Sequence, residues 1–295
     1  MSLSPDTSAA LARAGLDVGA VEALVRAAIA EDLAGGLDVT TVATVAAGAR
    51  ARLELVARQG GVVAGVPVAA AVYDVVGDCA IIGMVNDATR VTKGTSILAV
   101  DGAVSSLLVA ERTSLNLLCH LSGVATLTRR WVDAVSGTGA VIRDTRKTTP
   151  GLRALEKYAV RCGGGTNHRM SLSDAALVKD NHVVAAGGVA AAFSAVRERW
   201  PDLPVEVEVD SLEQLDEVLA AGADLVLLDN FSLVDLSEAV RRNDGRARLE
   251  ASGGLTLENA AEVAYTGVDY LAVGALTHSA PVLDIGADLG PAAED

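Results

Sequence analysis

From residue 140 onward, short apolar runs alternate with helical segments, and this alternation limits the possible folds more than any other feature. The runs are Ala140–Ile142, Ala175–Val178, Val205–Val209, Leu225–Leu228, Leu249–Ala251 and Tyr270–Val273. Segments of helical periodicity, such as Leu212–Ala221 and Leu257–Thr266, lie between them. Repeated βα units bury parallel strands beneath helices. The pattern therefore predicts an α/β barrel or a doubly wound sheet.

The run Val205–Val209 favours the barrel. Its period of two places Glu206, Glu208 and Asp210 on one face and the valines on the other. Three carboxylates on one side of a buried strand suit the mouth of a barrel, where catalytic groups lie at the carboxyl ends of strands. Asp229 ends the next run in the same way.

The earlier part of the chain mixes helices with strands. Its predicted helices are Val18–Leu33, Pro67–Val76 and a long stretch from about Ser105 to Val135. Asp17 is placed to cap the first of them. Arg50–Gly65 and Ala80–Val100 have the alternation and glycine breaks of antiparallel strands. This change of pattern along the chain predicts two domains.

Composition excludes several classes of function. The net charge is −14 and aromatic residues make up 3% of the chain, so we expect no nucleic-acid partner and no anionic-membrane partner. No apolar run approaches the ~18 residues of a membrane span, and residues 1–14 lack the pattern of a signal peptide. The chain has three cysteines, Cys79, Cys119 and Cys162, and they lie far apart in the sequence. An odd number of distant cysteines predicts a reduced cytoplasmic compartment.

A cationic segment stands out against this acidic background. Residues 112–179 carry a net charge of +7, so the remainder of the chain carries −21. The densest part, Arg143–Arg153, has four cationic side chains in eleven residues. Such a cluster repels itself, and a small polyanionic ligand would relieve the repulsion.

The cationic side chains that follow or end predicted strands are the first site candidates. They are Arg112, Arg146, Lys147, His168, Arg169 and Lys179. Arginine binds carboxylate and phosphate through two hydrogen bonds, and lysine supplies a point charge. Solvated surface charge is the alternative for each residue alone, but clustering against the net charge favours a binding site.

Glu208 and Asp229 are the acidic candidates. Paired carboxylates at the mouth suit a Mg²⁺ ion that bridges a pyrophosphate, or they face a developing positive charge on a sugar. A structural ion pair with the arginines is a third interpretation. The residues alone leave these three open.

Two glycine turns follow the last two predicted strands. They are Ser252-Gly253-Gly254 and Val273-Gly274-Ala275. Loops at these positions of α/β barrels often offer backbone N–H groups to a phosphate. His278 lies four residues after Gly274, and it either reaches the phosphate or is structural.

Six sequence motifs lie at the predicted strand ends and in their loops. They are Arg143-Asp-Thr-Arg-Lys-Thr-Thr-Pro-Gly-Leu-Arg153, Gly163-Gly-Gly-Thr-Asn-His-Arg169, Leu177-Val-Lys-Asp-Asn-His182, Val205-Glu-Val-Glu-Val-Asp210, Leu227-Leu-Asp-Asn230 and Ala251-Ser-Gly-Gly254. By these motifs the chain resembles quinolinate phosphoribosyltransferase, also called carboxylating nicotinate-nucleotide pyrophosphorylase, from about Glu31 to Gly286.

The resemblance implies an architecture. We expect an N-terminal α/β sandwich domain over residues 1–117 and a C-terminal incomplete α/β barrel over residues 118–280, with the tail 281–295 packing on the first domain. It also implies a homodimer with shared active sites, in which Arg112 reaches the partner's site.

The resemblance also implies a reaction and a set of roles. The family converts quinolinate and phosphoribosyl pyrophosphate, with Mg²⁺, into nicotinate mononucleotide, pyrophosphate and CO₂ for de novo NAD synthesis. By analogy, quinolinate is bound by Arg112, Thr145, Arg146, His168, Arg169 and Lys179. Lys147, Glu208 and Asp229 act catalytically on the phosphoribosyl group, the two acids holding the metal. Ser252, Gly253, Gly274 and His278 hold the 5′-phosphate.

Three alternatives remain at this stage. The first is a paralogous phosphoribosyltransferase that acts on another aromatic acid. The second is a non-catalytic metabolite-binding relative, and the third is an aldolase or isomerase with a phosphate-binding barrel. The dense carboxylate-binding set argues against the first. Lys147, Glu208 and Asp229 argue against the second, and a Schiff base trapped on Lys147 or Lys179 would support the third.

Overall fold

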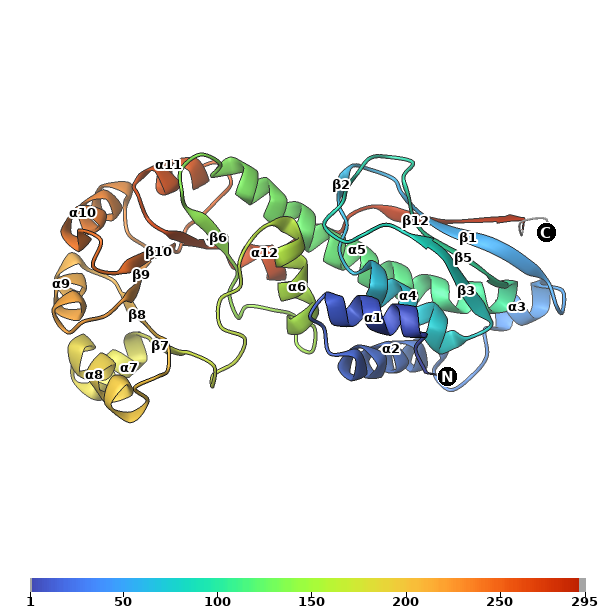
Figure 1. Cartoon of the computed structure of the whole chain (residues 1–295), viewed down its shortest axis with the longest axis horizontal. Helices are drawn as coiled ribbons and strands as arrows, with labels where there is room; N and C mark the ends of the chain where they lie inside the picture. The colour runs from blue at the N-terminus through green and yellow to red at the C-terminus, as the bar shows by residue number, and fades with distance from the viewer. Residues whose placement is uncertain (1, 292–295) are drawn as a thin grey trace. The chain divides into compact units, whose positions relative to one another are not determined.

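The computed structural model describes residues 2–291 and divides the chain into two compact units (Figure 1). The first unit runs to Leu127 and also contains Ala154–Gly163 and the chain from Ala280 onward. The second contains Thr128–Arg153 and Gly164–Ser279. The expected boundary at residues 117 and 118 falls within one helix, α5 (Val104–Ala134), which contributes to both units.

The first unit is built on a four-stranded antiparallel sheet in the order β12-β1-β5-β3. Its strands are β1 (Arg50–Ala57), β3 (Cys79–Met84), β5 (Ser96–Ala103) and β12 (Ile285–Pro291). The C-terminal strand β12 pairs with β1 along its length and forms one edge of this sheet. The two-residue strands β2 (Gly61–Val62) and β4 (Arg90–Val91) form a separate pair.

The first unit also contains the helices α1 (Pro5–Arg13), α2 (Val18–Leu33), α3 (Val39–Thr44), α4 (Val66–Val76) and α6 (Arg153–Gly163). Helix α4 packs on β3 and β5, and α1 and α2 pack on α4. Buried positions alternate with half-exposed ones along β1, as in a sheet with one covered face. The predicted α/β sandwich is confirmed, and Asp17 caps α2 as expected.

The second unit contains a six-stranded, all-parallel sheet in the order β6-β11-β10-β9-β8-β7. Its strands are β6 (Val141–Arg143), β7 (Ala176–Val178), β8 (Val205–Val209), β9 (Leu225–Asp229), β10 (Arg248–Ser252) and β11 (Tyr270–Ala272). Each strand bound lies within one residue of the apolar run predicted from the sequence.

The strand order distinguishes a barrel from a doubly wound sheet. Strands β7 to β11 follow one another without the reversal that marks a doubly wound sheet, and the last strand then pairs with the first, β6. The opening lies between β6 and β7. The expected incomplete barrel is therefore confirmed.

The barrel helices are α7 (Asp180–Ala186), α8 (Val189–Arg199), α9 (Leu212–Ala220), α10 (Leu233–Asn243), α11 (Ala260–Tyr265) and α12 (Ala275–His278). Helices α8, α9 and α11 pack on the strands, and α8 to α11 pack successively on one another (Figure 1). The valines of β8 are buried beneath them. No helix within residues 2–291 has the length and apolarity needed to span a bilayer.

Candidate active site

A cavity of about 390 Å³ lies at the carboxyl ends of the barrel strands. The predicted site residues that line it are Thr145, Arg146, Lys147, His168, Arg169, Lys179, Glu208, Asp229 and Ser252. Glu250 and the apolar side chains of Leu177, Leu227 and Ala272 complete the lining.

Parallel strands explain this convergence. Strand β6 ends at Arg143, so the next residues, through Lys147, leave the barrel at its mouth. Lys179 follows the end of β7 directly, and Asp229 and Ser252 end β9 and β10. Residues far apart in sequence meet here because all carboxyl ends face one way.

Four predicted residues lie outside this cavity. Gly253 lines a neighbouring cavity of about 210 Å³ that shares Ser252. Gly274 and His278 lie beside Lys147: a Cβ atom on Gly274 would lie 3.0 Å from Lys147 Cδ and 3.3 Å from His278 Nε2. Arg112 belongs to the first unit, and its side chain is 62% exposed.

The two cavity arginines have unused hydrogen-bonding capacity. Among residues 2–291, the Nε atoms of Arg146 and Arg169 are buried and have no hydrogen-bond partner. Arg169 donates from Nη1 to the carbonyl oxygen of Ala175 at 2.9 Å. Burial lowers the pKa of Arg169, and the nearby charge of Arg146 lowers it further. An anionic ligand would satisfy both Nε atoms and relieve the repulsion.

Glu208 and Asp229 project from neighbouring strands on another side of the cavity. Burial raises the pKa of Glu208, Lys179 opposes the shift, and Asp229 adds to it. Lys179 Nζ lies 3.7 Å from Glu208 Oε2, so Glu208 has an ion-pair partner, which is a lysine and not one of the arginines considered above. Two partly buried carboxylates that repel each other also fit a hard divalent cation, which prefers oxygen ligands.

Asp229 is held by the residue that follows it. Asn230 donates from Nδ2 to Asp229 Oδ2 at 2.8 Å, and its backbone N–H donates to the carbonyl oxygen of Ser252 at 2.9 Å. Asn230 has a left-handed backbone with φ of 57°. Gly253, with φ of 85°, leaves the space for it, because a Cβ atom at this position would overlap the Asn230 side chain.

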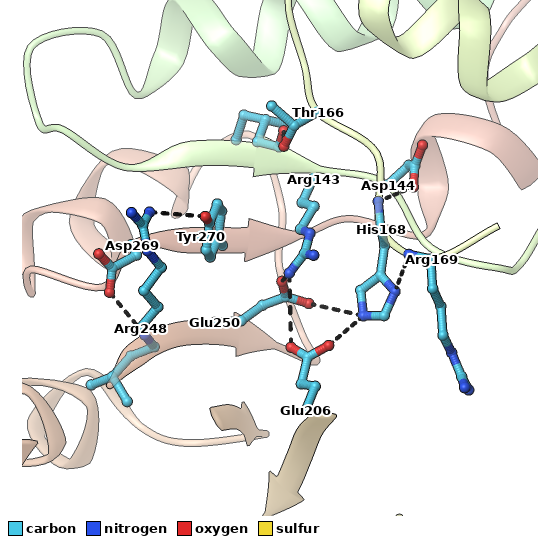
Figure 2. A network of polar contacts seen from close by, with 12 residues as sticks. Arg143, Asp144, Thr166, His168, Arg169, Glu206, Arg248, Glu250, Asp269 and Tyr270 are labelled. Atoms are coloured by element: carbon cyan, nitrogen blue, oxygen red, sulfur yellow. Dashed lines mark hydrogen bonds and ion pairs between the residues drawn. The ribbon is translucent and has the colours of Figure 1, made fainter. Parts of the chain in front are cut away.

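A buried cluster of four charged or polar side chains adjoins the cavity (Figure 2). We define the buried cluster as Arg143, His168, Glu206 and Glu250. Arg143 Nη1 lies 2.7 Å from Glu250 Oε2 and 3.9 Å from Glu206 Oε1. His168 Nε2 lies 2.5 Å from Glu206 Oε2 and 3.9 Å from Glu250 Oε1. The side chains are 16%, 8%, 3% and 0% exposed in that order, so this charge lies in the barrel interior.

The segment that carries His168 and Arg169 runs beside β6. Thr166 donates its backbone N–H to the Ile142 carbonyl at 2.9 Å and accepts from the Asp144 N–H at 3.1 Å. The buried Asp144 carboxylate accepts from the His168 backbone N–H at 2.8 Å. These bonds place His168 in the opening of the barrel, against β6 (Figure 2).

Arg143, Asp144 and Glu250 belong to the site but were not predicted from the sequence as parts of it. One signal was available: Glu250 lies between Leu249 and Ala251, with the period of two that singled out Glu206 and Glu208. Its partners are set by strand order, which one sequence does not reveal.

The fold and the cavity together define a class. An open α/β barrel with cationic groups and paired acids at its strand ends is a small-molecule enzyme of the phosphate-binding barrel type. Models of the quinolinate phosphoribosyl transferase N-terminal and C-terminal domains match residues 38–122 and 124–288. The chain belongs to the quinolinate phosphoribosyltransferase family.

Individual relatives agree with the family models. The chain is 58% identical over 271 residues to a Mycobacterium leprae protein named nicotinate-nucleotide pyrophosphorylase (carboxylating), which covers 90% of this chain and 95% of that protein. It is 40% identical over 241 residues to a probable enzyme of the same name from Synechocystis, covering 80% and 82%. The solved nicotinate-nucleotide pyrophosphorylase from Francisella tularensis superposes with a TM-score of 0.88 at 39% identity, covering 92% and 96%.

Proposed function

We propose that the chain transfers a phosphoribosyl group from phosphoribosyl pyrophosphate to the ring nitrogen of quinolinate and then releases CO₂, giving nicotinate mononucleotide and pyrophosphate for de novo NAD synthesis. One observation carries this function. A single cavity combines the guanidinium groups of Arg146 and Arg169, whose buried Nε atoms have no partner among residues 2–291, with the carboxylates of Glu208 and Asp229. The first set fits a dianionic acceptor, and the second fits a metal-bound pyrophosphate.

Quinolinate carries two adjacent carboxylates, so it requires several converging donors. Arg146 and Arg169 supply guanidinium groups whose buried Nε atoms lack partners within the described chain. Lys179 and Thr145 line the same cavity and supply a further cation and a hydroxyl group. This arrangement favours a dicarboxylate over a monocarboxylate, because a monocarboxylate would leave part of the cationic set unpaired.

The phosphoribosyl group would lie between Lys147 and the acids. Glu208 and Asp229 would hold a Mg²⁺ ion, whose chemistry when bound is to neutralise charge on the leaving pyrophosphate. Ser252, Gly253, Gly274 and His278 would hold the 5′-phosphate. The closeness of Gly274 to both Lys147 and His278 supports this placement, since it brings two side chains that can bind phosphate to one loop.

Two bond changes follow one another in the proposed reaction. The ring nitrogen attacks the anomeric carbon while the bond to pyrophosphate breaks, and the carboxylates stabilise the positive charge that develops on the sugar. As CO₂ then leaves, the electrons of the carbon–carboxylate bond stay on the ring carbon, where the adjacent positively charged nitrogen stabilises them. The resulting ring carbanion takes up one proton. Lys147 is the cation placed to stabilise negative charge during these steps.

We propose in addition a homodimer in which Arg112 completes the partner's cavity. Its side chain is 62% exposed and its nearest acid, Glu111, is 4.0 Å away, so its charge is available to a ligand. We also propose a reduced, cytoplasmic location, which the free thiols of Cys79, Cys119 and Cys162 support.

Mixing subunits tests the shared site. Arg112→Ala and Lys147→Ala enzymes should each be nearly inactive, whereas an equal mixture should recover about a quarter of wild-type activity. Half of the re-formed dimers would be mixed, and each would contain one intact site. Native mass spectrometry of differently tagged subunits checks the exchange. Verified exchange without recovery would contradict a shared site.

Arginine replacement tests the acceptor assignment. Arg169→Ala should raise the quinolinate KM by about 100-fold, since a charge-assisted bidentate contact is lost. The KM for phosphoribosyl pyrophosphate should change less than threefold. Steady-state kinetics measures both constants, with Arg241→Ala as the control, because Arg241 is 71% exposed on α10. Equal increases in the two constants would contradict the assignment.

Acceptor specificity tests the function itself. The purified enzyme should release pyrophosphate with quinolinate and should be at least 100-fold slower with nicotinate, which lacks the second carboxylate. Turnover of nicotinate alone would contradict the proposal and indicate a different acceptor.

A further inference from the structure

The hydrogen bonds of His168 limit what this residue does. The Arg169 backbone N–H donates to His168 Nδ1 at 2.7 Å, so Nδ1 is an acceptor. The proton of the neutral imidazole is then on Nε2, which donates to Glu206 Oε2 at 2.5 Å. Both ring nitrogens are therefore bonded within the protein, one to the peptide that carries Arg169 and the other to Glu206 (Figure 2).

Glu206 is itself held from the other side. Arg143 lies 3.9 Å from Glu206 and 2.7 Å from Glu250, and these three residues come from the alternate strands β6, β8 and β10. Alternate strands of a barrel contribute the side chains of one interior layer. The layer that underlies the cavity is thus charged where such layers are usually apolar.

Stability does not account for this layer. A buried ion-pair group is commonly no more stable than apolar side chains of similar size. Within the described chain, Glu206 Oε1 and Glu250 Oε1 are buried without a hydrogen-bond partner. Burial, together with the charge of Glu206, also raises the pKa of Glu250. Buried charges that destabilise a fold in this way are expected where they position residues of a binding or active site.

We propose that Glu206 is a positioning residue for the acceptor site: it fixes the His168 imidazole, and the imidazole fixes the backbone of Arg169. Arg143 and Glu250 hold Glu206 in place. The chain of contacts ends at the Arg169 guanidinium, which lines the cavity. This inference rests on the proposed function, because quinolinate is the ligand whose binding reports the position of Arg169.

Two substitutions of Glu206 test whether its hydrogen bond to His168 matters, apart from the size and charge of the side chain. Glu206→Leu is similar in size but cannot accept from His168, and it should raise the quinolinate KM at least tenfold. The KM for phosphoribosyl pyrophosphate should stay within twofold. Glu206→Gln keeps an acceptor oxygen and should recover most of the loss. If Glu206→Leu does not fold, Glu206→Asp keeps the charge but is shorter by one methylene, and it should raise the quinolinate KM three- to tenfold.

A double-mutant cycle tests the route through Arg169. Glu206→Leu should change the quinolinate KM less than twofold when it is added to Arg169→Ala, because the group it positions is gone. Equal increases in both substrate constants, or full additivity in the cycle, would overturn the inference and indicate a merely structural role. The wild-type enzyme is measured alongside. Lack of wild-type turnover would contradict the proposed function itself, whereas normal turnover by Glu206→Leu would contradict only the positioning role.

Discussion

Replacing Lys147 by alanine is expected to lower kcat by about two to three orders of magnitude, the usual effect of removing one preorganised charge or donor from a site. The ammonium group is well placed for this. The Lys147 backbone carbonyl accepts from Thr277 Oγ1 at 2.8 Å, and its backbone N–H donates to Thr145 Oγ1 at 3.0 Å. The Lys147 side chain passes close to Gly274, so the loop after β11 bounds it on one side.

Single-turnover and steady-state kinetics measure this effect on pyrophosphate and CO₂ release. Lys93→Ala is the matched control, because Lys93 is exposed in the turn between β4 and β5 of the other unit. Thermal unfolding confirms that both variants fold. A kcat for Lys147→Ala within threefold of wild type would remove Lys147 from the catalytic set.

Asp229→Asn is expected to reduce kcat/KM for phosphoribosyl pyrophosphate by about 100-fold or more, since the change removes a proposed metal ligand and a charge that we propose faces the sugar. The concentration of Mg²⁺ that gives half-maximal activity should rise. The quinolinate KM should change little, because the acceptor is held by the cationic groups.

The control for this change is Asp202→Asn. Asp202 is an exposed acid in the turn that precedes β8, at the amino end of that strand, and it lies outside the main cavity. It should leave kcat/KM and the Mg²⁺ requirement unchanged. A similar Mg²⁺ requirement in Asp229→Asn and wild type would contradict a metal at this position.

The six barrel strands were predictable from the sequence because buried parallel strands are short, apolar and bounded by turns. Val205–Val209 has the same bounds in the prediction and in the structure. Their order was not predictable, since pairing depends on contacts between distant segments. The pairing of β1 with β12 was not predictable for the same reason, because the two strands are far apart in the sequence.

Helix α1 was not among the helices predicted from the sequence, yet its residues carry a local helix-start signal. Ser4 accepts from the Thr7 backbone N–H at 3.2 Å, and Pro5 occupies the first turn. A capping serine followed by proline is a typical helix start. A helix-start signal of this kind is weak evidence when no other predicted element precedes it, which explains why α1 was not predicted.

The candidate site was more predictable at the strand ends than behind them. Lys179 and Asp229 were identified because they directly follow or end apolar runs. Glu250 shares the period of Glu206, but its partner Arg143 lies 107 residues away in sequence. Only the closure of β11 onto β6 brings the two together. The role of Gly253 likewise required structure, because its neighbour Asn230 comes from the preceding strand end.

The most direct test of the account is product analysis with quinolinate that carries ¹³C in the carboxylate next to the ring nitrogen. Incubation with phosphoribosyl pyrophosphate and Mg²⁺ should give unlabelled nicotinate mononucleotide and labelled CO₂ in equal amounts by mass spectrometry, with Lys147→Ala as the blank. Labelled mononucleotide, or no product from the folded enzyme, would contradict transfer coupled to decarboxylation at this site.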